Sequence, residues 1–133
     1  MFTISKAFSF CYGHRLKGDK GKCKNLHGHT AKVVLYLEAA ALDENGMVCH
    51  FDDLKNSLGK WINDNLDHAL LLAQDDPLVP ILKPHNEKIY LLEGRPTAEN
   101  IAKLIHDQAQ DMGHTLSKVE VWESETSRAV YQP

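Results

Sequence analysis

The stretch Cys23-Lys24-Asn25-Leu26-His27-Gly28-His29 precedes the most apolar strand-like run of the chain, Val33-Val34-Leu35-Tyr36-Leu37. Side chains alternate between the two faces of an extended strand, so His27 and His29 are expected to project to the same side. Two imidazoles on one side are well placed to share a metal ion. The stretch therefore predicts a strand, from about residue 29 to 39, that begins beside a pair of metal ligands.

A third imidazole is available from His14, which follows another strand-like run. Residues 2–12 alternate, with one face carrying Phe2, Ile4, Phe8 and Phe10. Three neutral imidazoles with one open position are the arrangement of a catalytic zinc ion rather than of a closed structural site. The alternative for each histidine is a strand residue that only hydrogen-bonds to the backbone.

Cys23 leaves two possibilities open. As a fourth ligand it would close the site and make the zinc structural. As a free thiolate near the metal it would be a base or nucleophile, because the positive field lowers a thiol pKa. The surrounding segment, residues 16–26, is rich in Lys and Gly. It is expected to be a solvated loop, or one whose lysines attract an anionic substrate.

The bulk composition restricts the class of protein. A chain of 133 residues is expected to form a single domain, 1–133. The net charge of -3, with mixed signs, excludes a basic footprint for nucleic acid. No run approaches the ~20 apolar residues that span a bilayer, so we expect no membrane partner and a cytoplasmic location. Three cysteines argue against a disulfide framework, and Cys11 and Cys49 are expected to be buried.

The remaining patterns predict two helices and further strands. Asp43-Glu44-Asn45-Gly46 signals a hairpin before a third strand at 47–51. Asp52 or Asp53 is expected to cap a helix that ends near Leu66, and Thr97 a second helix that ends near Met112. Three prolines exclude a regular helix within 69–95, which retains only a short strand at 89–92. Two strands, 118–126 and 128–132, complete an α+β fold with both helices on one face of an antiparallel sheet.

Two acidic residues outside the loop are candidates for a role in catalysis or ligand binding. Asp67 beside His68 can raise the basicity of that imidazole and orient it for proton transfer, unless the pair is simply an exposed helix end. Period two places Glu123 on the same face as the apolar Val119 and Val121. A carboxylate there needs donors, such as the two N–H groups of a ligand edge, unless the strand has already emerged into solvent.

These features together resemble the 6-pyruvoyl-tetrahydropterin synthase and 6-carboxy-tetrahydropterin synthase family. The resemblance spans nearly the whole chain except residues 69–95, and its motifs follow in order: Phe10 with His14-Arg15, Cys23-x-x-x-His27-Gly28-His29, Leu66-Asp67-His68, Pro96-Thr97-Ala98-Glu99-Asn100 and Trp122-Glu123. It implies the tunnelling fold (T-fold), a four-stranded antiparallel sheet with two helices. It also implies a homohexamer, built as a dimer of trimers, with active sites between subunits. His50 departs from the Asp that many relatives carry.

The resemblance also implies a role for each residue. His14, His27 and His29 would hold Zn²⁺, and Cys23 would be the catalytic base rather than a ligand. Asp67 and His68 would handle protons with it. Glu123 would bind the pterin, with Thr97 and Glu99 lining the pocket.

The implied enzyme is a zinc-dependent lyase acting on 7,8-dihydroneopterin triphosphate. Loss of triphosphate and acetaldehyde gives 6-carboxy-5,6,7,8-tetrahydropterin, a queuosine precursor, whereas retention of the side chain gives 6-pyruvoyl-tetrahydropterin. The absence of an N-terminal extension favours the carboxy product. The alternatives are a non-catalytic structural zinc or pterin-binding module, and an aldol cleavage of dihydroneopterin.

Overall fold

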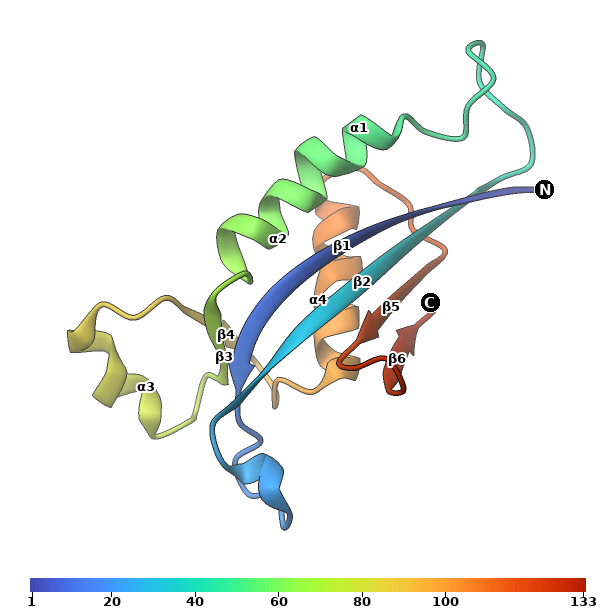
Figure 1. Ribbon diagram of the computed structural model, residues 1–133. Helices are drawn as coiled ribbons and strands as arrows, with labels where there is room; N and C mark the ends of the chain where they lie inside the picture. The colour runs from blue at the N-terminus through green and yellow to red at the C-terminus, as the bar shows by residue number, and fades with distance from the viewer.

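A computed structural model describes residues 1–133 and shows an α+β fold built on one curved sheet (Figure 1). The sheet has six strands in the order β4-β3-β1-β2-β5-β6. Their bounds are β1 Phe2–His14, β2 His27–Ala39, β3 Ala69–Ala73, β4 Ile89–Leu92, β5 Lys118–Trp122 and β6 Arg128–Tyr131. The predicted α+β class is confirmed, but the sheet has two more strands than the four that the family resemblance implies.

The β1–β2 hairpin is the longest paired unit of the sheet. It pairs antiparallel from Phe2 opposite Ala39 to His14 opposite His27. The predicted alternation is confirmed, because Phe10 is buried in the core whereas the neighbouring Ser9 is exposed. Both strands extend past the predicted bounds to include a histidine. The hairpin therefore places both metal-ligand motifs of the sequence at one end.

The first helix is continuous but contains a π-helical turn. It consists of α1 Phe51–Leu54, the turn Lys55–Gly59 and α2 Lys60–Asn65. The predicted cap at Asp52 or Asp53 is wrong. The N-cap is His50, whose Nδ1 accepts a hydrogen bond from Asp52 N at 3.2 Å. The ring nitrogen thus satisfies one of the free N–H groups of the first turn.

The predicted strand at 47–51 is also wrong. Both edges of β2 are occupied, by β1 on one side and β5 on the other, so a further hairpin strand has no free edge there. The segment instead forms bends before the helix begins. Asp43 closes the preceding turn, because its carboxylate accepts hydrogen bonds from Asn45 N and Met47 N.

The second long helix, α4 Ala98–Asp111, crosses behind the hairpin (Figure 1). Thr97 caps it as predicted, since its Oγ1 accepts from Asn100 N at 3.2 Å. Both long helices bury their apolar stripes in the same core as the hairpin. The core side chains include Phe10, Val33, Leu35, Leu54, Leu58, Ile62, Ile101 and Ile105. Both helices therefore cover one face of the sheet, as expected.

Residues 69–95 are more regular than predicted. β3 pairs parallel to β1 and to β4, so this part of the sheet is not antiparallel. A short helix, α3 Leu78–Leu82, contains Pro80 and is followed by a 3-10 turn. Pro80 is tolerated because a proline within the first helical turn lacks only an N–H group that has no partner there. The prediction that three prolines exclude a regular helix within 69–95 was therefore too strict for this short helix.

Two further expectations concern exposure. Cys11 and Cys49 are partly exposed rather than buried, and all three cysteines are free. Cys11 lies on the sheet face opposite to the core, and Cys49 lies outside any strand. None of the helices has the length and apolar character required to cross a membrane.

Candidate metal centre and substrate pocket

The end of the β1–β2 hairpin brings three imidazoles together. His14 is opposite His27, and Tyr12 is opposite His29, so all four side chains project from the core-facing side of the sheet. One ring nitrogen from each histidine lies within 4.8 Å of the others. The Nε2 atoms of His14 and His27 are 3.1 Å apart. Two nitrogens bound to one tetrahedral zinc ion lie about 3.3 Å apart, which is close to this spacing.

Hydrogen bonds to the backbone fix the tautomers of two of the rings. His14 Nδ1 lies 2.7 Å from the Pro96 carbonyl oxygen, and His27 Nδ1 lies 2.7 Å from the Asn25 carbonyl oxygen. A carbonyl oxygen only accepts, so each Nδ1 must donate its proton. Both Nε2 atoms then carry lone pairs that face each other. Burial also lowers the pKa of His14, which disfavours the imidazolium form that would relieve this repulsion.

His29 completes the case for a cation. Its Nε2 is buried and has no hydrogen-bond partner. Two facing lone pairs beside a buried ring nitrogen without a partner are costly unless a proton or a metal lies between them, and backbone carbonyls that orient ligand histidines are typical of metal sites. The donor set is therefore suited to a divalent ion that binds imidazole nitrogen, with His14, His27 and His29 as its ligands.

Cys23 is not part of this ligand group. It lies in a 3-10 turn, Lys22–Lys24, within the loop that connects β1 to β2. The loop is closed at its base by a hydrogen bond from Leu16 N to the Cys23 carbonyl oxygen. In this conformation the site has three nitrogens and no sulfur ligand, which does not favour the closed structural site.

Glu123 directly follows β5 and faces the imidazoles. Its Oε1 lies 4.0 Å from His14 Nε2 and 3.9 Å from His29 Nε2. The β2–β5 register continues the face of Val33 and Val121 to this carboxylate, as the period-two pattern predicted. Glu123 is 28% exposed, so it has emerged from the core but remains part of the site.

Tyr12 is a member of this cluster that the sequence analysis missed. It is 3% exposed, and its hydroxyl donates to Glu123 Oε1 at 3.4 Å. Burial, followed by the Glu123 charge, raises the pKa of this phenol, so it remains a neutral donor. The sequence could have indicated this position, because Tyr12 precedes His14 by two residues and the period of a strand places both side chains on one face.

A cavity of about 340 Å³ adjoins Glu123. Thr97 and Glu99, at the start of α4, line it together with Glu123, Ser127 and Arg128. The contact between His14 and the Pro96 carbonyl brings this end of α4 next to the imidazoles. The structure thus assembles all three residues predicted to bind substrate in one cavity beside the ligand group.

Asp67 and His68 form the predicted pair, with His68 Nδ1 2.7 Å from Asp67 Oδ2. Both residues immediately precede β3. Asp67 Oδ1 accepts a hydrogen bond from the backbone N–H of Cys11, in β1, at 2.9 Å. Burial would raise the pKa of Asp67, but the bonds from Cys11 and His68 lower it below its usual range.

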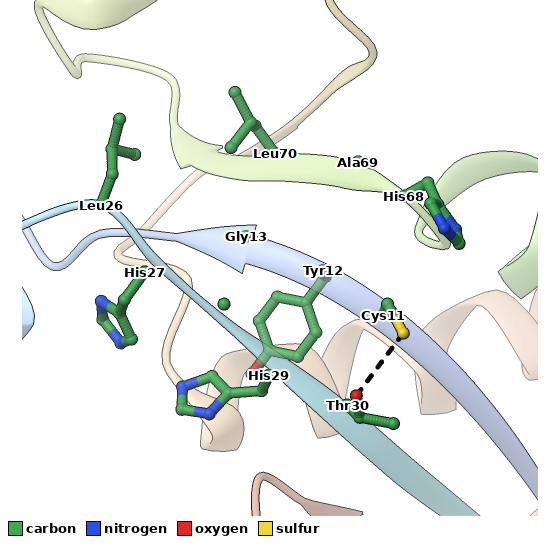
Figure 2. Close-up of a pocket in the computed structure, with 11 residues that line it drawn as sticks. Cys11, Tyr12, Gly13, Leu26, His27, His29, Thr30, His68, Ala69 and Leu70 are labelled. Carbon is green, nitrogen blue, oxygen red and sulfur yellow. Dashed lines mark hydrogen bonds between the residues drawn. The ribbon is translucent and has the colours of Figure 1, made fainter.

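His68 lies apart from the ligand nitrogens. It lines a cavity of about 600 Å³ together with Cys11 and Thr30, and with two of the imidazoles, His27 and His29 (Figure 2). Cys11 and Thr30 alternate with the inward-facing residues of the hairpin and so belong to its other face. The ligand group includes neither Asp67 nor His68. Within this chain, the pair therefore borders the same cavity as His27 and His29 but takes no part in the ligand group.

The family model of 6-pyruvoyl tetrahydropterin synthase matches residues 3–133. The chain belongs to this family. The 6-carboxy-5,6,7,8-tetrahydropterin synthase of Haemophilus influenzae is 38% identical over 99% of both chains. That of Aquifex aeolicus is 34% identical over 98% of both. Membership in this tetrahydropterin synthase family supports an enzyme of the lyase type with a pterin substrate.

Solved structures confirm the T-fold of this family member. An uncharacterized protein from Wolinella succinogenes matches with a TM-score of 0.82 at 29% identity, covering 98% of this chain and 97% of that one. The 6-pyruvoyl tetrahydropterin synthase of Caenorhabditis elegans matches with a TM-score of 0.75 over 99% of this chain and 95% of that one. Because its identity is 24%, this second match establishes the fold alone.

One further contact stabilises the end of the hairpin that carries the imidazoles in this synthase-family chain. Arg15 directly follows His14, and its Nε and Nη2 both donate to the carboxylate of Asp76. Asp76 is 2% exposed and also accepts from Leu78 N. The Arg15 guanidinium lowers the pKa of this carboxyl. A residue of the 69–95 segment therefore anchors the end of β1.

Proposed function

We propose that this protein is a zinc-dependent 6-carboxy-5,6,7,8-tetrahydropterin synthase that converts 7,8-dihydroneopterin triphosphate and water to the carboxy product with loss of triphosphate and acetaldehyde. The observation that carries the proposal is the group of His14, His27 and His29, with two fixed tautomers and one buried nitrogen without a partner. Beside it lies a cavity lined by Glu123 and Thr97. Family membership supplies the reaction class, and this geometry supplies a metal site next to a pocket.

The zinc ion, held by the three imidazoles, would act as a Lewis acid toward the side-chain hydroxyls of the substrate. Glu123 binds the pterin edge, accepting from N3–H and the 2-amino group in a bidentate manner. Thr97 and Glu99 line the same cavity. Cys23, as a thiolate, removes a carbon-bound proton beside the polarised oxygen. Asp67 orients His68, which returns a proton to another carbon.

We infer that this division of labour extends over more than one copy of the chain. His68 is 79% exposed and is not a member of the imidazole group, although it lines a cavity with His27 and His29. A residue with that exposure is available to complete a site on a neighbouring subunit. We therefore place the Asp67–His68 pair of one subunit against the metal centre of another, in a homohexamer built as a dimer of trimers.

The identity of the product separates two members of the same family. Elimination of triphosphate with retention of the side chain gives 6-pyruvoyl-tetrahydropterin, and loss of two carbons as acetaldehyde gives the carboxy product. The curated relatives from Haemophilus influenzae and Aquifex aeolicus carry the carboxy name, which favours the second outcome and a role in supplying a queuosine precursor. The pyruvoyl product is the second candidate, because the matched family model carries that name.

Incubation with 7,8-dihydroneopterin triphosphate, followed by mass spectrometry of the pterin and derivatisation of released aldehydes, tests the proposal. We expect 6-carboxy-5,6,7,8-tetrahydropterin and acetaldehyde from the zinc-loaded protein. Retention of all three side-chain carbons would replace the proposal by the pyruvoyl reaction. Release of glycolaldehyde would indicate aldol cleavage and would contradict both.

A further inference from the structure

We propose that Lys88 is a positioning residue that holds the backbone turn on which the catalytic His68 is presented. Lys88 directly precedes β4 and belongs to the 69–95 segment, which carries none of the motifs of the family resemblance. The catalytic part of the inference rests on the proposed function, because that function makes His68 a proton donor. The inference gives the 69–95 segment a part in the reaction.

His68 has an unfavourable backbone conformation. Its φ is 56°, in the left-handed region that residues with a Cβ seldom adopt. Such a conformation persists only where neighbouring contacts fix it. One set of contacts comes from β1, because His68 N donates to the Cys11 carbonyl oxygen at 2.6 Å and the Asp67 carboxylate accepts from Cys11 N. These bonds fix the N–H group of the peptide that joins Asp67 to His68.

Lys88 fixes the other end of that peptide. Its Nζ donates to the Asp67 carbonyl oxygen at 2.6 Å. The peptide between the two members of the pair is therefore held at its N–H group by β1 and at its carbonyl group by Lys88. Because the plane of this peptide sets the direction in which the His68 side chain leaves the backbone, these two bonds together determine where the imidazole lies.

Two more hydrogen bonds tie Lys88 to the surroundings of the turn. Its Nζ also donates to the Asn63 carbonyl oxygen at 3.2 Å, in the last turn of α2. Carbonyl groups at the end of a helix have no partner within it and interact favourably with a positive charge. The carbonyl oxygen of Lys88 accepts from Leu70 N at 2.9 Å, two residues after His68. Lys88 thus contacts the chain on both sides of His68.

The backbone of Lys88 is itself fixed by the sheet. The next residue, Ile89, pairs with Leu70 in the parallel ladder between β3 and β4. Tyr90 packs edge-on against Trp61 of α2, with ring centroids 5.7 Å apart. The Lys88 side chain is exposed, so water can replace its hydrogen bonds when the ammonium group is removed. We therefore expect its loss to loosen the turn without unfolding the protein.

The Lys88→Met variant removes the ammonium group and keeps most of the aliphatic chain. We expect kcat to fall roughly tenfold, the low end for a hydrogen bond to a charged group, because the side chain is exposed. Zinc content and neopterin affinity should not change, since Lys88 contacts no residue assigned to either. Lys88→Arg should recover most of kcat. Lys83→Met, at another exposed lysine of the same segment, is the matched control and should behave as the wild type.

A second measurement reports the turn without any reaction. Hydrogen–deuterium exchange, followed by mass spectrometry of the fragment covering residues 66–70, should be faster in Lys88→Met than in the wild type or in Lys83→Met. The His68 N–H group lies in this fragment and is one of those that the loosened peptide would expose. Unchanged exchange in Lys88→Met overturns the inference.

A double variant separates positioning of His68 from simple capping of the helix. In a His68→Ala background, Lys88→Met should not lower kcat further, because no imidazole remains to be held. An equal fall of kcat in both backgrounds, or loss of zinc from Lys88→Met, overturns the inference. If the wild type formed no product, the proposed function would fail, and the exchange measurement would still decide whether Lys88 holds the turn.

Discussion

The contact between Arg15 and Asp76 leads to a quantitative prediction. Replacing Asp76 by Asn keeps the shape of the side chain and removes its charge. Breaking a buried ion pair by removing one partner costs about 3–5 kcal/mol, because the remaining charge is buried without compensation. Arg15 is 23% exposed, so water partly compensates its guanidinium. We therefore expect Asp76→Asn to lower the free energy of unfolding by about 2–3 kcal/mol at pH 7.

The loss should depend on pH in a defined direction. Arg15 lowers the pKa of Asp76 in the folded protein, so the unfolded chain binds the proton more tightly. The stabilisation by this ion pair is complete above the pKa of Asp76 in the unfolded chain, about 3.9. It disappears as the pH falls through the lower pKa of Asp76 in the folded protein. Wild type and variant should therefore differ fully at pH 7 and progressively less below about pH 4.

The assay is urea unfolding at one protein concentration, with a chelator present so that metal binding does not contribute. Asp75→Asn is the matched control, because Asp75 is 79% exposed and meets Lys17 only at 3.7 Å. An exposed pair contributes little, so this variant should behave almost as the wild type. Equal losses from both substitutions, or a loss that persists unchanged at pH 3, would refute the reasoning.

Further predictions concern the site. His27→Ala should lower zinc affinity by at least about a hundredfold, measured by chelator competition. Mutating a residue that only hydrogen-bonds to a metal ligand typically lowers metal affinity about 10–100-fold, and loss of the ligand itself should cost more. Cys23→Ala should retain zinc in elemental analysis but lose turnover; loss of the metal would instead make Cys23 a ligand. Glu123→Gln should weaken neopterin binding strongly at unchanged zinc content, and wild-type affinity would remove Glu123 from the pocket. His68→Ala should reduce kcat without altering zinc content, and an unchanged kcat would contradict its role in proton transfer.

Much of the fold and the ligand group could be predicted from the sequence because strand periodicity is local information. The spacing of His27 and His29 was sufficient to place two imidazoles on one face, and the strand pairing adds His14 opposite His27. The same period placed Glu123 on the face of Val119 and Val121. These predictions depend on one strand at a time, and the pairing of β1 with β2 preserves them.

The remaining features depend on contacts that periodicity does not encode. The strand β3, Ala69–Ala73, is an apolar run without alternation, and such a run cannot be distinguished from a buried helical segment. The cap at His50 depends on a ring nitrogen rather than on the usual Asp side chain. The position of Asp67 and His68 at the start of β3 follows from the parallel pairing of β3 with β1, which the sequence did not indicate.

The uninterrupted pairing of β1 with β2 also limits how this chain can change in length. One residue inserted between Tyr12 and His14, or between His27 and His29, would turn one imidazole toward the opposite face of the sheet. The connection at 15–26 joins the two strands next to the imidazoles and lies outside the ladder, whereas the connection at 40–50 follows the opposite end of the hairpin. Loop grafting between Leu16 and Cys23, with Arg15 and Cys23 kept in place, is therefore the practical route to altering substrate access while the ligand geometry is retained.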